Sequence, residues 1–153
     1  MILQKIILYI NTTAHDEIII ALRSNGSALK GQTKAQMTSS QTIAEKKIKA
    51  VRNQAEKLVP AIETLLKKNK VKLSALTKII VAPHGGSFTS LRIGVITANA
   101  LAFALKIPVE AEPVVGADGQ KIKIKTKKFG SYSIIEPSYD REPNIGVSKK
   151  PKL

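Results

Sequence analysis

Two apolar runs of strand length open the chain. Residues 4–10 (QKIILYI) and 17–23 (EIIIALR) are almost continuously apolar, which predicts two buried strands. Asn25-Gly26 follows the second run and favours a two-residue hairpin turn, because both central positions of that turn need positive φ. We therefore predict a third strand over residues 28–33, which would complete an antiparallel meander of three strands.

Apolar positions spaced by three and four residues then predict a long first helix. The residues of this period are Ala44, Ile48, Val51, Ala55, Leu58, Ile62 and Leu65. Pro60 lies inside the run and predicts a kink rather than an end, because the apolar period resumes in phase after it. Lysine and arginine side chains fill the outer face of this predicted helix.

A second helix is predicted over residues 88–105, and it is apolar on nearly every side. Arg92, Asn99 and Lys106 are spaced by seven and form one narrow polar stripe. A helix with so wide an apolar surface must be buried on more than one side. The sheet can cover one side. The other needs the first helix, a second copy or a different protein, unless burial within the domain is sufficient.

Shorter segments complete the predicted fold. Residues 78–82 (KIIVA) predict a buried strand before the second helix, and Pro108 starts another strand (VEAEPVV) after it. Asp118-Gly119 signals a second hairpin turn, and the strict alternation of residues 121–125 (KIKIK) predicts a strand with one basic face. The domains we expect are a core over 1–110, a hairpin and extension over 111–145, and a disordered basic tail over 146–153.

The charge of the chain favours a polyanionic partner. Lysine and arginine number 25 against 11 acidic residues, which gives a formal net charge of +14. Neutralising phosphates releases counterions and requires no reading of sequence, although solubility alone is a competing explanation. The candidate RNA contacts are Lys46, Lys49 and Arg52 in the first helix region and Lys123, Lys125 and Lys127 in the basic segment 121–128.

Residues that carry metal or redox chemistry are scarce. Cys is absent, which excludes disulfides and thiolate metal sites. His15 and His84 are the two histidines, and no carboxylate cluster accompanies them in the sequence. We therefore expect no metal, no cofactor and no catalytic residue. No apolar run is predicted to span a membrane, and the start lacks the pattern of a signal peptide, so the expected compartment is the cytoplasm.

The turn before the second helix carries a family signature. Residues 86–94 (GSFTSLRIG) resemble the G-S-F-T-G-x-R-I-G motif of the bacterial TsaB (YeaZ-like) family, and residues 95–105 resemble that family's V-A-T-A-K-G-L-A-F-A-L stretch. Residues 55–60 (AEKLVP) resemble its S-E-R-L-L-P segment, including the proline within the helix. Residues 137–141 (PSYDR) resemble its C-terminal P-x-Y-x-R pattern. The resemblance covers residues 1–110 well, and its GSFT segment is the most specific part.

This resemblance implies an α/β fold. The expected architecture is a single ribonuclease-H-like lobe of the actin and Hsp70 superfamily, with a mixed sheet, two main helices and a C-terminal β-hairpin. Family members usually carry a second lobe, and the residues after Glu110 are too few for one, so the resemblance implies a shortened member. It also implies a non-catalytic accessory protein that binds TsaD, the catalytic subunit for threonylcarbamoyladenosine formation on tRNA.

The chain departs from the family pattern at three places. Asn11 stands where an Asp is usual, His84-Gly85-Gly86 replaces G-P-G, and Gln54 replaces a frequent His. Actin-like enzymes bind nucleotide between two lobes and use carboxylates to hold metal. One lobe without Asp at position 11 is therefore expected to bind neither nucleotide nor metal well.

Two candidate sites follow. The first is a possible anion site at Gly85, Gly86, Ser87 and Thr89, since a helix N-terminus offers unpaired N–H groups; a tight capped turn explains the same residues. The second is a partner interface on the helix pair, which in longer relatives contacts the catalytic subunit. Its residues are Val51, Ala55, Leu58, Ile62, Val95, Ala98, Ala102 and Leu105. The expected partner is a TsaD-like subunit or a second copy.

Two other classes of function compete with the accessory role. One is a basic nucleic-acid-binding protein outside this pathway. The other is a nuclease or small-molecule enzyme on the same fold, which needs several acidic residues clustered at strand ends. Only Asp16 and Glu17 lie near the first strand, so the sequence favours this class least.

Overall fold

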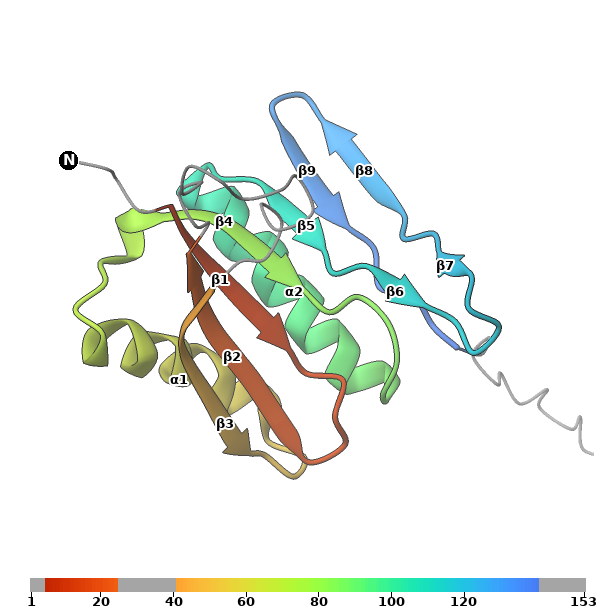
Figure 1. Cartoon of the computed structure of the whole chain (residues 1–153), viewed down its shortest axis with the longest axis horizontal. Coiled ribbons are helices and arrows are strands. Elements are labelled where there is room, and N and C mark those ends of the chain that lie inside the picture. Colours follow the sequence, from red (N-terminus) through yellow and green to blue (C-terminus); the bar gives the residue numbers. More distant parts are fainter. Residues whose placement is uncertain (1–4, 25–40, 141–153) are drawn as a thin grey trace, which may run out of the picture.

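The computed structural model describes residues 5–24 and 41–140, and a five-stranded sheet forms its centre (Figure 1). The strands are β1 (Ile6–Asn11), β2 (Glu17–Ser24), β3 (Gln41–Lys49), β4 (Leu76–Val81) and β5 (Val109–Ala111). Their order across the sheet is β3-β2-β1-β4-β5. β2 pairs antiparallel with β1 and β3, whereas β4 pairs parallel with β1 and β5. This confirms the mixed sheet predicted for a single ribonuclease-H-like lobe.

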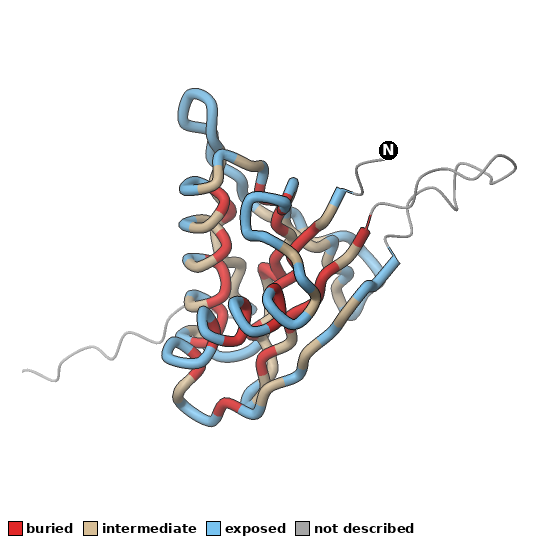
Figure 2. The backbone as a smooth tube through the Cα atoms, turned by 90° about the vertical axis from the view of Figure 1, so that its left-hand side faces the viewer, coloured by how far each residue is buried: buried red, intermediate tan, exposed pale blue. Residues whose placement is uncertain are grey.

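Two helices cover the sheet and contact each other. α1 (Gln54–Lys68) lies against β2 and β3, and α2 (Phe88–Leu105) lies against β1, β4 and β5. A 3₁₀ turn, η2 (Leu73–Ala75), leads from α1 into β4. Buried side chains from both helices and the central strands form one apolar cluster, visible as the buried segments of the tube in Figure 2. Its fully buried members include Leu8, Ile10, Leu58, Ile79 and Val81.

The structure contradicts the predicted start of the first helix. Residues 41–49 form β3, and α1 begins only at Gln54. Ala44 and Ile48 are four residues apart, which places them on one face of a helix and equally on one face of a strand. Along β3 they are half-buried between exposed neighbours, as the strand period of two requires. The predicted third strand over 28–33 lies outside the described residues.

The helix α1 continues through Pro60, as predicted, and the predicted kink stays a prediction. Pro60 lies within the helix, which continues to Lys68. A proline has no N–H, so the carbonyl of Glu56 loses its usual partner within the helix. Pro60 and the exposed Glu56 both lie on the outer side, where water can satisfy that carbonyl.

The segment after α2 differs from its prediction in two ways. VEAEPVV is divided at Pro113 into β5, which joins the main sheet, and β6 (Val114–Val115). β6 pairs with β7 (Lys121–Ile122) around the predicted Asp118-Gly119 turn, but the KIKIK ladder ends at Ile122. A further hairpin, β8 (Thr126–Phe129) with β9 (Tyr132–Ile135), was not predicted. Its turn contains Gly130 at a φ of +60°.

α2 is the one helix in the described ranges that is long and apolar enough to span a membrane, with 18 residues and a mean hydropathy of 1.5. Its packing accounts for much of this composition. The buried residues of α2 are Ser90, Leu91, Gly94, Val95, Ala98 and Ala102. Ile96 and Phe103 remain 63% and 60% exposed, so the sheet and α1 together do not cover the apolar surface of α2.

A hydrogen bond from Tyr9 links β1 to Glu112, which follows β5. The Tyr9 hydroxyl donates to Glu112 Oε2 (2.8 Å) and accepts from Asn11 Nδ2 (3.2 Å), while the Arg23 guanidinium lies 3.9 Å from the ring centroid. Burial of the phenol, followed by its hydrogen bond to the Glu112 carboxylate and that group's charge, raises the pKa of Tyr9 to about 12.

Ala98→Arg is expected to unfold the domain. Ala98 is fully buried against the sheet, so the substitution forces a long charged side chain into the core at a cost above about 4 kcal/mol. Ala100→Arg is the matched control, because Ala100 is exposed on the same helix. Circular dichroism and thermal melts of the two variants test the packing. A folded Ala98→Arg variant would show that this face of α2 is not in the core.

Tyr9→Phe is expected to destabilise the protein by about 1–2 kcal/mol near neutral pH, because the hydrogen bond to Glu112 is lost. Because the pKa of Tyr9 is raised in the folded state, its hydroxyl contributes fully to the stability of the fold below pH 10. This contribution is lost as the pH rises through about 12. The two proteins should therefore converge in stability over that range. The tyrosinate absorbance difference between them should have its midpoint near 12, and a midpoint near 10 would contradict the assignment.

Candidate functional sites

The turn after β1 fixes that strand to α2. Asn11 Oδ1 accepts hydrogen bonds from Thr13 N (2.9 Å) and Thr13 Oγ1 (2.7 Å). The buried Thr12 donates from Oγ1 to the Ser90 carbonyl (2.5 Å), and a Cβ at Gly94 would collide with that hydroxyl. The amide oxygen at the family's Asp position is therefore used within the turn. In the described ranges, no three His, Asp or Glu side chains lie together as a metal site would require.

Gly85 and Gly86 make the turn between β4 and α2. Their φ values are +90° and +74°, and a Cβ on Gly86 would collide with a carbonyl of the turn after β1. Ser87 caps α2, because its Oγ accepts from Ser90 N (3.1 Å) and donates to Ser90 Oγ (2.7 Å). This geometry favours the capped turn. Anion binding at Gly85, Gly86, Ser87 and Thr89 stays a prediction.

Gln54, at the family's His position, joins the starts of both helices. Its buried side chain donates from Nε2 to the His15 carbonyl (3.3 Å) and to Ser90 Oγ (3.2 Å). An open cavity of about 380 Å³ lies beside it, lined by Arg52, Asn53 and Thr89 among others. Gln54 therefore fixes how close the N-terminal ends of α1 and α2 lie.

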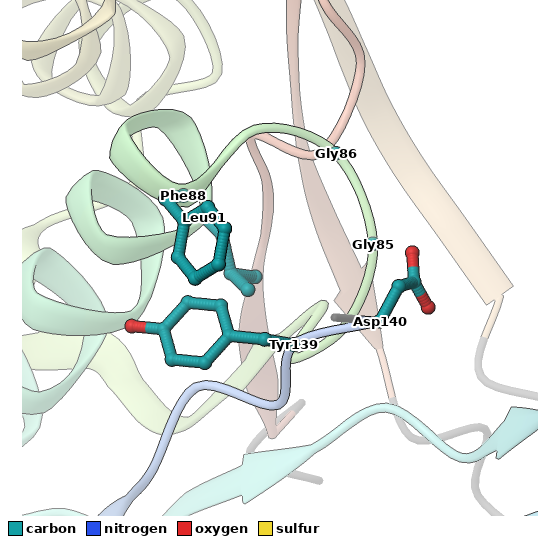
Figure 3. Close-up of a pocket in the computed structure, with 6 residues that line it drawn as sticks. All are labelled: Gly85, Gly86, Phe88, Leu91, Tyr139 and Asp140. Atoms are coloured by element: carbon teal, nitrogen blue, oxygen red, sulfur yellow. The ribbon is translucent and has the colours of Figure 1, made fainter. Parts of the chain in front are cut away.

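The segment after β9 docks against the start of α2 (Figure 3). Tyr139 stacks on Phe88 with ring centroids 4.5 Å apart. His84 Nδ1 lies 3.0 Å from Ser138 Oγ, and His84 Nε2 lies 2.5 Å from Asp140 Oδ1. A cavity of about 280 Å³ remains between this segment and the Gly85-Gly86 turn. His84, one of the two histidines for which the sequence predicted no metal site, holds the PSYD segment in place.

Two residues of the polar stripe on α2, Arg92 and Asn99, bind this C-terminal segment. Arg92 Nε donates to the Tyr139 hydroxyl (2.7 Å). Asn99 donates to the Ile135 carbonyl and accepts from the Ile135 N–H, both at 2.9 Å. The sequence showed the spacing of Arg92 and Asn99 but did not predict that these residues bind the C-terminal segment. A narrow polar stripe on an otherwise apolar helix, together with the P-x-Y-x-R resemblance, was the signal available.

Most of the predicted interface residues are not on a surface. Leu58, Ile62, Val95, Ala98 and Ala102 are at most 3% exposed, and they pack in the core. Val51 precedes α1, so the structure contradicts its assignment to the first helix.

Of the remaining two, Leu105 is half-buried and Ala55 is exposed. The predicted residues therefore lie mostly on the inward side of the helix pair. The spacing of apolar residues in a sequence cannot tell which apolar side of a helix meets the sheet.

An exposed apolar surface lies beside the predicted one. We define the α1–α2 groove as the open cavity of about 570 Å³ lined by Val59, Ile62, Leu66, Val71, Leu73 and Leu101, with Glu63, Lys67 and Lys72. Val59 is 53% exposed and Leu73 is 42% exposed. Ile62 and Leu66, which also line it, are only 3% and 5% exposed, so its exposed apolar surface comes mainly from Val59 and Leu73. Exposed aliphatic side chains with charged residues among them are typical of protein-binding surfaces.

The candidate RNA contacts fall into two separate groups. Lys46 and Lys49 lie on β3 and Arg52 lies in the following loop, which corrects their assignment to a helix face. Lys127 is exposed on β8, and Lys123 and Lys125 are exposed in the link between the two C-terminal hairpins.

These hairpins lie beyond the opposite edge of the sheet from β3, since β9 contacts β5 (Figure 1). The structure therefore does not gather the six residues into one basic patch.

Comparison with known proteins agrees with this geometry. The model of the family described as TsaD, tRNA N6-adenosine threonylcarbamoyltransferase, matches residues 35–113, just over half of the chain. The tRNA threonylcarbamoyladenosine biosynthesis protein TsaB of Bacillus subtilis (strain 168) is 40% identical over 60 residues. Those residues are 39% of this chain and 26% of the relative.

Solved structures give the same result. An uncharacterized protein with similarity to peptidase YEAZ from Pseudomonas aeruginosa has a TM-score of 0.55 and 27% identity over 71% of this chain and 43% of its own. YeaZ from Pseudomonas aeruginosa has a TM-score of 0.54 and 26% identity over 71% of this chain and 44% of its own. The chain thus spans less than half the length of these relatives. The match over residues 35–113, the sheet topology and the GSFT turn together show that the chain belongs to the TsaD family and is a TsaB/YeaZ-like member of it.

Proposed function

We propose that this protein is a non-catalytic accessory subunit in the formation of threonylcarbamoyladenosine on tRNA, and that it binds the catalytic TsaD subunit. The observation that carries the proposal is the likeness to TsaB, together with the match of the TsaD family model to residues 35–113, which contain both helices. The chain matches only part of the length of its relatives, so the pathway, the substrate and the partner are all parts of this proposal.

The α1–α2 groove is the surface proposed to receive TsaD. Val59 and Leu73 expose aliphatic side chains at its border, and Leu101 contributes from α2. Burial of such side chains against a partner releases about 25 cal/mol for each Å² of apolar surface. The charged groups Lys67 and Glu63 form an exposed ion pair there, and they can set orientation rather than affinity.

A non-catalytic role fits the chemistry at the end of β1. In a metal- or nucleotide-binding lobe of this kind, a carboxylate would be useful after the first strand. Here the position is held by Asn11, whose amide oxygen already accepts two hydrogen bonds from Thr13. Asp16 and Glu17 are the acidic residues nearest to it in sequence, and Glu17 pairs into β2 opposite Lys49.

Val59→Arg is expected to weaken binding to TsaD from the same organism while the fold is kept. The substitution replaces an exposed apolar side chain of the groove by a charged one, and the loss of such an interface contact changes affinity by about tenfold. Val115→Arg is the matched control, because Val115 is 60% exposed on β6, away from the groove. Calorimetric titration with purified TsaD measures both variants.

The outcomes of this titration separate two errors. If Val59→Arg binds TsaD like the unmodified protein, the docking surface is misplaced while the function stands. If the unmodified protein does not bind TsaD at all, the proposed function is wrong. Sedimentation velocity of the protein alone shows whether a second copy occupies the groove instead.

A further inference from the structure

Half of the aromatic residues in the chain form one exposed cluster. The chain has three Phe, three Tyr and no Trp. Phe103, Phe129 and Tyr132 are 60%, 45% and 42% exposed, and we call them the aromatic cluster. The rings of Phe103 and Tyr132 meet edge to face with centroids 4.9 Å apart, and Phe129 stacks on Tyr132 at 5.6 Å. A small protein rarely leaves its scarce aromatic side chains exposed without a use for them.

The packing of β9 against α2 holds the aromatic cluster in place. Phe103 projects from α2, while Phe129 and Tyr132 face each other across the tight turn between β8 and β9. The two hydrogen bonds between Asn99 and the backbone of Ile135 attach β9 to α2. The rings are therefore preorganised, so a ligand that stacks on them loses little conformational entropy of the protein.

The surroundings of the cluster are basic. An open cavity of about 820 Å³ borders it, lined by Phe103, Tyr132, Lys106, Lys128, Ser131 and Ser133 among others. Residues 119–135 contain five lysines and no acidic residue.

The lysines differ in how they are engaged. Lys127 pairs with Glu136 at 2.6 Å. No ion pair within the described ranges involves Lys106 or Lys128. Two ammonium groups beside an exposed aromatic cluster thus remain available to an anionic ligand.

We propose that the aromatic cluster, Lys106 and Lys128 form a binding site for single-stranded nucleic acid. Unpaired bases stack on the exposed rings, and the adjoining phosphates contact the two ammonium groups. Stacking needs only the π-face that every base has, and the lysines need only phosphate, so the binding is insensitive to sequence. Duplex nucleic acid offers the phosphates but not the base faces. This site does not depend on the binding of TsaD.

The charge of the cavity disfavours a protein-only explanation. A second copy of the chain, docked on the same site, would bring its own Lys106 and Lys128 against those already present. Like charges brought together in this way cost free energy unless anions intervene. The same charge favours a phosphate backbone, whose neutralisation releases counterions.

The test is fluorescence anisotropy with labelled, unstructured oligonucleotides about 12 nucleotides long, as RNA and as DNA, and with the matching duplex. We expect the full chain to bind the single strands more tightly than the duplex. Tyr132→Ala and Phe103→Ala should each weaken single-strand binding by about 5- to 150-fold, which corresponds to the loss of one stacked base. Tyr132→Phe keeps the ring and should keep the affinity.

The lysines are tested by the salt dependence. Lys106→Ala with Lys128→Ala should lower the slope of log affinity against log salt by about 1.4, since each phosphate contact to a single strand contributes about 0.7. The matched control is Lys47→Ala on β3 with Lys68→Ala at the end of α1, which removes the same charge from residues that do not line the cavity. That control should leave the slope and the affinity nearly unchanged.

Several outcomes would overturn the site. They are absence of binding at low salt, equal binding of duplex and single strand, or an affinity that Tyr132→Ala and Phe103→Ala leave intact. A dimer in sedimentation velocity that Phe103→Ala dissolves would assign the cluster to a second copy. Phe103 is exposed on a stable helix, so an unchanged melting temperature of Phe103→Ala keeps the result interpretable. Binding of TsaD by this variant separates failure here from failure of the proposed function.

Discussion

The side-chain amide of Asn99 makes the contact on which the C-terminal third of the structure depends. It satisfies the N–H and the carbonyl of Ile135, a residue 3% exposed, at 2.9 Å each. Without this partner, two buried backbone groups would lack hydrogen bonds at a cost of about 1–3 kcal/mol each. Arg92 repeats the arrangement two turns earlier by donating to Tyr139. The few polar residues of α2 therefore hold the C-terminal segment against a helix that is otherwise apolar.

The sequence predicted the main sheet and α2 because their signals are redundant. Residues 4–10 and 17–23 are too apolar and too short for surface helices, and the GSFT turn agrees with the family pattern. β3 was missed because Ala44 and Ile48 satisfy the strand period and the helix period alike. The hairpin of β8 and β9 was missed because TKKF is wholly exposed, so no hydrophobic alternation marks it.

The candidate sites were harder to predict than the fold, for a geometric reason. Val95, Ala98 and Ala102 form the small-residue side of α2, which a sequence can assign equally to a partner helix or to the sheet. Only three-dimensional packing shows that the sheet takes it, and that exposed Val59 lies at the surface instead. The aromatic cluster joins residue 103 to residues 129 and 132, and no local pattern connects positions that far apart.

The geometry of α2 separates the two proposed surfaces. Leu101 contributes to the α1–α2 groove, and Phe103 contributes to the aromatic cluster. Two residues along a helix correspond to a rotation of about 200°, so these side chains project to opposite sides of α2. A protein partner in the groove would therefore leave the aromatic cluster accessible to a nucleic acid strand. Because Asn99 attaches β9, which carries Tyr132, to α2, changes in one surface should reach the other only if the docking of the C-terminal segment is lost.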